Sequence, residues 1–303
     1  MMCYVGQQAV FEEAEDLLYV LCGVNINAKQ IERVCHHYGE QIEKEDTTMI
    51  ETQIQHQYSQ HDKNQLHYAM LDGAMYLTRE DKWKEAKMGR IFKAADNLHI
   101  SQNRGAVTDS QYVVHLGNHK DFLSKFEYYL DDLRSLVIIA DGAKWIWNWA
   151  DTFYPDATQI LDYYHALEHL CEFATSYFKE DNERTTWIEK QAKILIEENA
   201  DKIIDCLRKL PESTNKKTEK DKLRLINYYV KNRKRMRYGS FIKRGLLIGS
   251  GAIESAHRTV LQQRMKLSGQ RWTKKGFQQM ANIRAVKKSG DWERIIDLTK
   301  NAA

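Results

Sequence analysis

The apolar run at residues 136–140, Leu-Val-Ile-Ile-Ala, is the stretch that most restricts the possible folds of this chain. Apolar residues that follow one another without polar alternation are typical of a strand buried on both faces of a sheet. The run ends at Asp141-Gly142, and a second strand candidate, residues 157–161, ends at Asp162. A carboxylate at the carboxyl end of such a strand can point into the crevice above the sheet. The sequence therefore predicts a sheet with acids at its strand ends.

Further strands and helices are expected on both sides of this run. Residues 67–71 form a short strand candidate that ends at Asp72-Gly73, and 83–94 and 111–116 can add two more strands. Helices are expected at 119–132, 162–178, 183–236 with a break at Pro211, and 273–287. Strands followed by a helical block and then two more helices predict a mixed α/β fold, a sheet domain with a helical insertion.

Two helices separated by a glycine turn are expected at the start of the chain. Residues 7–22 place Ala14, Leu17, Leu18 and Leu21 at helical spacing, and Gly23 can end that helix. Asn27 can cap a second helix with Ile31, Val34, Cys35 and Tyr38 on one face. Helix, turn and helix resemble a DNA reader, whereas the acidic charge of this region favours a docking or dimerisation segment.

The charge is distributed unevenly along the 303 residues, although the formal net charge is only +3. Residues 1–64 carry 4 Lys or Arg against 11 Asp or Glu, whereas 211–243 carry 11 against 3 and 245–303 carry 11 against 4. A basic second half suits a polyanion such as nucleic acid. No apolar run reaches membrane-spanning length. The five cysteines are scattered without a CxxC pair, which indicates neither a zinc ribbon nor disulfides and fits a reducing cytoplasm.

A third acid follows the glycine-rich turn Gly249-Ser250-Gly251. Glu254 lies at the start of a helix expected to run to about residue 267. An Asp-Gly pair alone is usually an ordinary turn. Asp72, Asp141 and Glu254 together are more specific, because converging carboxylates bind hard divalent cations through oxygen. Two such ions can activate a water or hydroxyl and stabilise the leaving oxygen of a phosphodiester.

The sequence around these acids resembles that of a known enzyme family. VIIADGAKWIWNWADTFYPDATQILDYYHALEHL resembles the second-aspartate region of bacterial insertion-sequence DDE transposases, and GSGAIESAHRTVLQQRMKLSGQRWTKKGFQQMANIRA resembles their glutamate helix. LDGAMYLTRE followed by WKEAKMGRIF resembles the first-aspartate region. The nearest group is the ISKra-like transposases, and Mutator-type enzymes share the same plan. The resemblance covers roughly residues 66–290.

The resemblance implies an RNase H-like fold with Asp72, Asp141 and Glu254 as the catalytic and metal-binding triad. It implies Mg²⁺ or Mn²⁺ in a two-ion site, hydrolysis at a transposon end, and attack of the freed 3′ hydroxyl on target DNA. A homodimer around paired DNA ends, acting at the nucleoid in the bacterial cytoplasm, is also implied. The expected organisation is a helical N-terminal segment at 1–64, core at 65–180, a helical insertion at 181–245, and core with the glutamate helix at 246–303.

The family's Asp-x-x-His signature is matched by Asp162 and His165, which implies that both lie beside the active site and contact DNA. Without the resemblance, a histidine that opens a helix is more often a packing or capping residue. His169 lies one helical turn later, so a zinc pair with His165 is an alternative. The alternating Trp145, Trp147 and Trp149 can stack on exposed bases, or they can pack in the core.

Basic residues near the glutamate are expected to contact the DNA backbone. Arg258 lies one turn after Glu254 and can orient the carboxylate or hold a phosphate. A solvated helix face is the alternative for the basic run that starts at Lys231. The expected DNA-contacting cations are Lys231, Arg233, Lys234, Arg235, Arg258, Arg264, Lys266, Arg271, Lys274 and Lys275.

The amino-terminal region departs from the family pattern, because relatives carry a longer region there that recognises transposon ends. Residues 1–64 are therefore expected to be a shortened form of that region. Three rivals to a transposase stay open. They are an RNase H-like nuclease or resolvase, an inactive DNA-binding remnant of a transposase, and a helical interaction protein with no role at nucleic acid.

Overall fold

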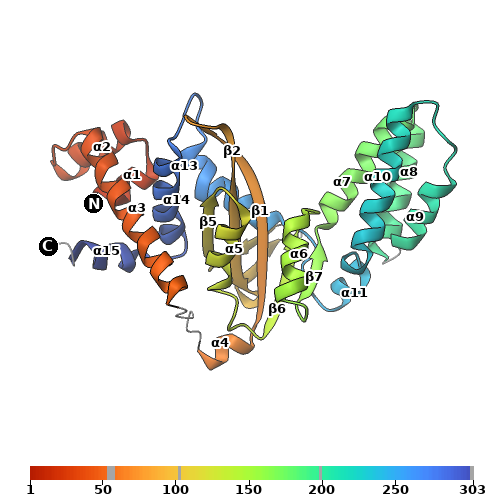
Figure 1. The fold of residues 1–303 in the computed structure, drawn as a ribbon, viewed down its shortest axis with the longest axis horizontal. Coiled ribbons are helices and arrows are strands. Elements are labelled where there is room, and N and C mark those ends of the chain that lie inside the picture. Colours follow the sequence, from red (N-terminus) through yellow and green to blue (C-terminus); the bar gives the residue numbers. More distant parts are fainter. Residues whose placement is uncertain (53–58, 102–103, 198–199, 301–303) are drawn as a thin grey trace. The chain divides into compact units, whose positions relative to one another are not determined.

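The computed structural model divides the chain into two compact units (Figure 1). Unit 1 comprises Met1–Leu136 and Gly251–Ala303, and unit 2 comprises Val137–Ser250. The residues that the structure describes are 1–52, 59–101, 104–197 and 200–300.

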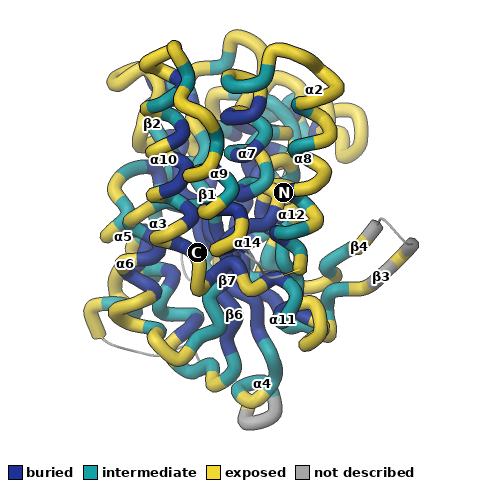
Figure 2. The backbone as a smooth tube through the Cα atoms, turned by 90° about the vertical axis from the view of Figure 1, so that its right-hand side faces the viewer, coloured by how far each residue is buried: buried dark blue, intermediate teal, exposed yellow. Residues whose placement is uncertain are grey.

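Unit 1 contains three antiparallel strands in which β2 (Lys82–Lys93) pairs with both β1 (Leu66–Thr78) and β5 (Gln111–Leu116). A separate hairpin joins β3 (Asn97–Ser101) to β4 (Arg104–Val107). In β1 and β2 the buried residues form continuous runs, 67–71 and 86–92, whereas Leu98 and Ile100 of β3 are exposed (Figure 2).

The strand predicted at 67–71 does not end at Asp72-Gly73, and that prediction is wrong. β1 continues to Thr78, and Asp72 and Gly73 pair with Met88 and Lys87 in the middle of the ladder. Continuous pairing with β2 outweighs the local preference of an Asp-Gly pair for a turn.

Helices of unit 1 cover both faces of its strands. Phe126 of α5 (His119–Glu127) occupies the space that a side chain at Gly89 would need. The neighbouring residue, Arg90, points to the opposite face and donates from Nη1 to the carbonyl of Ala252 in α12 (Gly251–Ala256) at 2.7 Å. Because Asp72 lies directly opposite Met88, it shares the face that α12 covers.

The first helices belong to unit 1 and pack against α14 (Lys274–Lys288). The helix predicted at 7–22 is interrupted at Ala9-Val10 and forms α1 (Met2–Gln8) and α2 (Phe11–Cys22), of which Leu17 and Leu21 are exposed. Gly23 ends α2 with a φ of 66°, and Asn27 caps α3 (Ala28–Glu51) through Gln30 N, so both predicted caps are confirmed. The remaining helices of unit 1 are α4 (Gln60–Asn64), η1 (Ala94–Asp96), η3 (His257–Gln262), α13 (Gln263–Met265) and α15 (Trp292–Lys300).

Unit 2 begins inside β6 (Ser135–Ala140), which pairs in parallel with β7 (Thr158–Leu161). The apolar run at 136–140 is buried throughout, as its composition predicts. The helices of unit 2 are α6 (Lys144–Phe153), α7 (Tyr163–Tyr177), α8 (Asp181–Ile196), α9 (Ala200–Lys209), α10 (Lys216–Asn232), η2 (Arg233–Arg235) and α11 (Tyr238–Lys243).

Hydrogen bonds from buried tyrosines fasten these helices together. The Tyr229 hydroxyl of α10 donates to the carbonyl of Ala166 in α7, and the Tyr238 hydroxyl of α11 donates to the carbonyl of Leu161 in β7. With antiparallel pairs in unit 1 and a parallel pair in unit 2, the chain is a mixed α/β protein. Within the described ranges, no helix combines the length and the apolar character that a membrane span requires.

Candidate active site

The first predicted acid, Asp72, lies in unit 1 with its side chain 33% exposed. Its Oδ1 accepts a hydrogen bond from Gly73 N at 2.7 Å. Its Oδ2 lies 3.4 Å from Nε2 of His257, a residue 185 positions further along the chain. β1 therefore meets the segment that follows Glu254 at the carboxylate of Asp72.

His257 is a site residue that the sequence argument missed. Its ring is buried, and burial lowers the pKa of His257 to about 4, so the ring is neutral at pH 7. It begins the π-helical segment η3, a local widening of the helix that is frequent at functional sites. Its position three residues after Glu254 was the available clue, because residues i and i+3 lie close together on a helix.

The third predicted acid, Glu254, lies on α12 and is exposed to solvent. Its neighbours Ile253 and Ala256 are buried, so α12 packs on the strands and leaves the carboxylate outside. The bond from Arg90 to Ala252 fixes the first turn of this helix. Unit 1 thus holds Asp72 and the Glu254 helix on the same face of its strands.

Gly73 has a different role from the turn that the sequence suggested. A side chain at this position would collide with the carboxylate of Glu85, which lies across the ladder. The Nζ of Lys87 lies 2.7 Å from Glu85 Oε2 and also donates to the carbonyl of Gly117 at 2.7 Å. The space at Gly73 that was expected for a ligand is therefore filled by Glu85, on the face opposite to the one that Asp72 shares with α12.

The second predicted acid, Asp141, lies in unit 2 directly after β6, as predicted. Its Oδ1 accepts from Ala143 N at 2.9 Å, and its main-chain carbonyl accepts from the Trp147 indole at 2.7 Å. These two bonds turn the chain from the strand into α6. The space beside Gly142 is also occupied, because a side chain there would collide with the ring of Tyr228 on α10.

Carboxylates are suitable donors for Mg²⁺ or Mn²⁺, which prefer oxygen ligands. In the described part of the chain, no three His, Cys, Asp or Glu side chains are grouped closely enough to hold one ion. The triad is divided between the units, with Asp72 and Glu254 in unit 1 and Asp141 in unit 2. The carboxylate oxygens of these acids are ligands that a hard cation prefers. Asp141 follows the end of β6, Asp72 lies within β1, and Glu254 lies on α12.

Asp162, a predicted DNA contact, is buried and fully engaged with the protein. Its Oδ1 accepts from the main-chain nitrogens of Tyr164 at 2.7 Å and His165 at 3.3 Å, which caps α7. Its Oδ2 accepts from Ser250 N at 3.0 Å and from the Ser250 hydroxyl. In the structure, Asp162 is a buried helix cap that also binds the loop at Ser250, whereas the resemblance implied a contact with DNA.

His165 lies on the accessible side of α7, with its side chain 42% exposed. Its Nδ1 is 3.4 Å from Glu168 Oε2, and its ring centroid is 5.4 Å from that of His169. His169 in turn lies 3.4 Å from Glu172 and packs edge-on against Tyr228. These histidines have carboxylate neighbours one turn away, but among the residues that the structure describes no three His, Cys, Asp or Glu side chains around them form a metal site, so a zinc pair has no support.

The tryptophans that follow Asp141 lie on a helix. Trp147 and Trp149 are buried, which confirms core packing for two of the three. Trp145 is half-buried. Arg235 lies 4.5 Å from the centroid of the Trp147 ring and is an ion-pair partner of Asp151 at 2.5 Å.

The predicted basic surface is divided between exposed and buried cations. Arg235 is buried by these contacts. Arg264 is also buried: it donates from Nε to the Gly6 carbonyl at 3.0 Å and lies over the ring of Phe11. The expectation that both form an exposed DNA-facing surface is wrong, because each neutralises or fills an internal site. The exposed members are Lys231, Arg233, Lys234, Arg258, Lys266, Arg271, Lys274 and Lys275.

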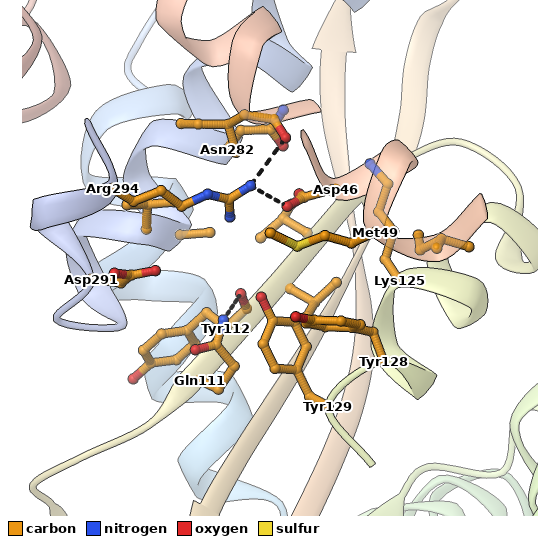
Figure 3. A pocket seen from close by; sticks show the side chains of 16 residues that line it. Asp46, Met49, Gln111, Tyr112, Lys125, Tyr128, Tyr129, Asn282, Asp291 and Arg294 are labelled. Carbon is orange, nitrogen blue, oxygen red and sulfur yellow. Dashed lines mark hydrogen bonds and ion pairs between the residues drawn. The ribbon is translucent and has the colours of Figure 1, made fainter. Parts of the chain in front are cut away.

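A small, partly open cavity of about 40 Å³ in unit 1 is lined by none of the predicted acids (Figure 3). Arg294 crosses it and donates to Asp46 at 2.6 Å and to Glu45 at 2.8 Å, and Tyr128 and Tyr129 close the opposite side. This volume holds one or two waters and no substrate. The cavity is therefore a packing feature between α3, α14 and α15 rather than a second active site.

The model of an uncharacterised protein family, UPF0236, matches residues 115–301. This range contains Asp141 and Glu254 and begins after Asp72. No curated protein sequence matches the chain.

Proposed function

The chain belongs to the UPF0236 family, and from its acidic residues we propose that it is a DDE transposase of an insertion sequence. In this proposal, Asp72, Asp141 and Glu254 are the catalytic acids of an RNase H-like core related to the ISKra-like group. The reaction is metal-dependent cleavage of DNA at a transposon end, followed by strand transfer. Residues 65–180 and 246–303 form the core, and 181–245 form its helical insertion.

The observation that carries the proposal is the contact between Asp72 and His257 in unit 1. It brings the strand with the first acid to the helical segment with the third, although 182 residues separate Asp72 from Glu254 in sequence. The strand-end position of Asp141 supports the same assignment.

The residues of the chain have distinct tasks in the proposed reaction. Bound Mg²⁺ or Mn²⁺ would supply an activated water or hydroxyl and charge neutralisation at the leaving oxygen. Asp72 accepts a hydrogen bond from Gly73 N and lies 3.4 Å from His257, and Asp141 accepts one from Ala143 N. Glu254 is exposed on α12 and available to the substrate side. No covalent protein intermediate is needed, because water and the DNA 3′ hydroxyl are the nucleophiles.

DNA binding in this proposal rests on the cations that remain exposed. Lys231, Arg233 and Lys234 in unit 2, and Arg258, Lys266 and Arg271 in unit 1, can pair with backbone phosphates without reading the sequence. His165 and Trp145 are further candidates for contacts with the DNA end. The partner is double-stranded DNA in the bacterial cytoplasm, held by a homodimer.

The test uses isosteric changes of the three acids, Asp72→Asn, Asp141→Asn and Glu254→Gln. Each is expected to abolish Mg²⁺- or Mn²⁺-dependent cleavage and joining of DNA that contains the element's ends, while the circular dichroism spectrum stays that of the wild type. Removing a transition-state charge interaction typically costs about 100-fold or more in rate. Asp205→Asn, at an exposed acid on α9, is the matched control and keeps full activity.

The rivals give different products in the same assay. Cleavage without any joined product would indicate a nuclease or resolvase. Binding of DNA without cleavage by the wild type would indicate an inactive remnant. Normal cleavage by the Asp141→Asn variant would remove Asp141 from the triad.

A further inference from the structure

Tyr228 of α10 is a half-buried residue with a buried hydroxyl that the proposed chemistry does not yet use. Its ring lies against Gly142, the residue after the second acid. A Cβ at position 142 would collide with Cε2 of Tyr228 and lie 2.9 Å from its hydroxyl oxygen. Because Gly142 has no side chain, the ring of Tyr228 fits beside it. This packing places the Tyr228 hydroxyl at the end of β6.

The Tyr228 hydroxyl is shielded from water and has no hydrogen-bond partner among the residues that the structure describes. A buried hydroxyl without a partner destabilises the folded protein, so its presence calls for a physical reason. Burial, together with the charges of Asp141 and Asp162, raises the pKa of Tyr228. A shielded, unpartnered hydroxyl in this place can gain by donating a hydrogen bond to a nearby acceptor.

The surroundings leave Asp141 as the acceptor that best meets this need. Both oxygens of Asp162 are engaged by Tyr164, His165 and Ser250. Asp141 uses Oδ1 for Ala143 N, and a carboxylate has room for further donors. On its other side, the ring of Tyr228 packs edge-on against His169 with centroids 4.6 Å apart, which holds the ring over Gly142.

We infer that Tyr228 is a positioning residue whose hydroxyl, unpartnered among the described residues, donates to the Asp141 carboxylate when a divalent cation binds and then fixes the orientation of that carboxylate. This inference rests on the proposed function, because it assigns Asp141 as a metal ligand. Groups that hydrogen-bond to a metal ligand orient it, and losing one typically costs about 10–100-fold in metal affinity or activity.

The experiment compares wild-type protein with Tyr228→Phe, which removes the hydroxyl and keeps the ring over Gly142. Mn²⁺ binding is titrated without DNA, followed by the electron paramagnetic resonance of free Mn²⁺. The thermal midpoint is measured in chelator. We expect Mn²⁺ affinity to fall about tenfold, and the Mn²⁺ concentration that gives half-maximal cleavage to rise by the same factor. The midpoint without metal should stay the same or rise, because a buried unpartnered hydroxyl is gone.

The matched control is Tyr164→Phe. The Tyr164 ring packs against Gly249 as Tyr228 packs against Gly142, but Tyr164 is 65% exposed. This variant should keep the Mn²⁺ affinity of the wild type. Gly142→Ala, which displaces the Tyr228 ring, should weaken Mn²⁺ binding in the same direction as Tyr228→Phe.

Three results would overturn the inference while leaving the proposed function intact. One is unchanged Mn²⁺ affinity in Tyr228→Phe when Asp141→Asn abolishes it. Another is a lower midpoint in chelator, which would make the hydroxyl a structural group. The third is weaker DNA binding in chelator with unchanged Mn²⁺ affinity, which would assign the hydroxyl to a phosphate. Failure of Asp141→Asn to alter Mn²⁺ binding or cleavage would instead refute the proposed function, and the inference with it.

Discussion

Two histidines of unit 1, His115 and His257, are buried in their neutral form. Burial lowers the pKa of each to about 4, and neither finds a strong acceptor or donor to offset this. His115 lies on β5, with its side chain 15% exposed and its Nε2 3.7 Å from Asp121. His257 lies beside Asp72, where a neutral ring adds no positive charge that would compete with a cation for the carboxylate.

The sign of the resulting pH dependence follows from the unfolded state. An unfolded histidine takes up a proton below its pKa of about 6.5, whereas these buried rings do so only near 4. Their stabilising contribution is therefore complete above pH 6.5 and is lost as the pH falls toward 4. At pH 5 a histidine with such a shift contributes up to about 2 kcal/mol less than at pH 7.5.

His115→Gln is the variant that tests this, because position 115 is away from the proposed acids. The free energy of unfolding of the variant should fall less between pH 7.5 and pH 5 than that of the wild type, by about 1–2 kcal/mol. Urea unfolding at several pH values measures it. His37→Gln, at an exposed position on α3, is the control and is expected to keep the wild-type profile. Equal pH slopes for His115→Gln and the wild type would contradict the assignment.

At the scale of elements, Asp162 joins three segments of unit 2. It follows β7, caps α7 and holds Ser250, the last residue of the unit. The main chain adds a further bond, from Tyr163 N to the Ile248 carbonyl at 2.9 Å. In the Asp-x-x-His motif, which the resemblance associates with DNA, the aspartate therefore has a structural role. Of the two residues, only His165 remains accessible to solvent.

Asp162→Ala should therefore act on stability. Loss of the cap and of the Ser250 bonds is expected to lower the free energy of unfolding by about 2–4 kcal/mol, measured by urea unfolding. Asn215→Ala, which removes a single exposed cap bond at the start of α10, is the matched control and should cost about 1 kcal/mol. A stable Asp162→Ala protein that has only lost DNA affinity would restore the role that the sequence suggested.

Over the whole molecule, the sequence predicts features that depend on neighbouring residues better than features that depend on long-range packing. The buried run of β6, the cap at Asn27 and the glycine stop at Gly23 depend on neighbouring residues, and the sequence predicts them correctly. The extension of β1 beyond Asp72 depends on its ladder with β2, and the burial of Arg264 depends on a carbonyl at Gly6. His257 and Tyr228 become visible only when segments distant in sequence are brought together.

The same distinction applies to the amino-terminal segment, which the sequence sets apart at residue 64. In the structure, α3 packs so closely on α14 that a side chain at Gly39 would collide with the main chain of Gln279. Asn282 donates to the Gly39 carbonyl at 3.0 Å beside this contact. The N-terminal helices are thus part of the core of unit 1, and their acidic residues meet basic partners such as Arg294.

Gly39→Ala tests whether this packing makes the segment inseparable from the strands. Backbone cannot move aside as a flexible side chain can, so the added methyl should cost about 3 kcal/mol, despite the helix preference of alanine of about 1 kcal/mol. Hydrogen exchange measured by mass spectrometry should show α3, β1 and β2 losing protection together. Lys44→Ala, at an exposed position of the same helix, is the control and should leave protection unchanged. If α3 alone lost protection while β1 and β2 kept theirs, the segment would be a separable module, and a role as an independent DNA-binding or docking region would regain its support.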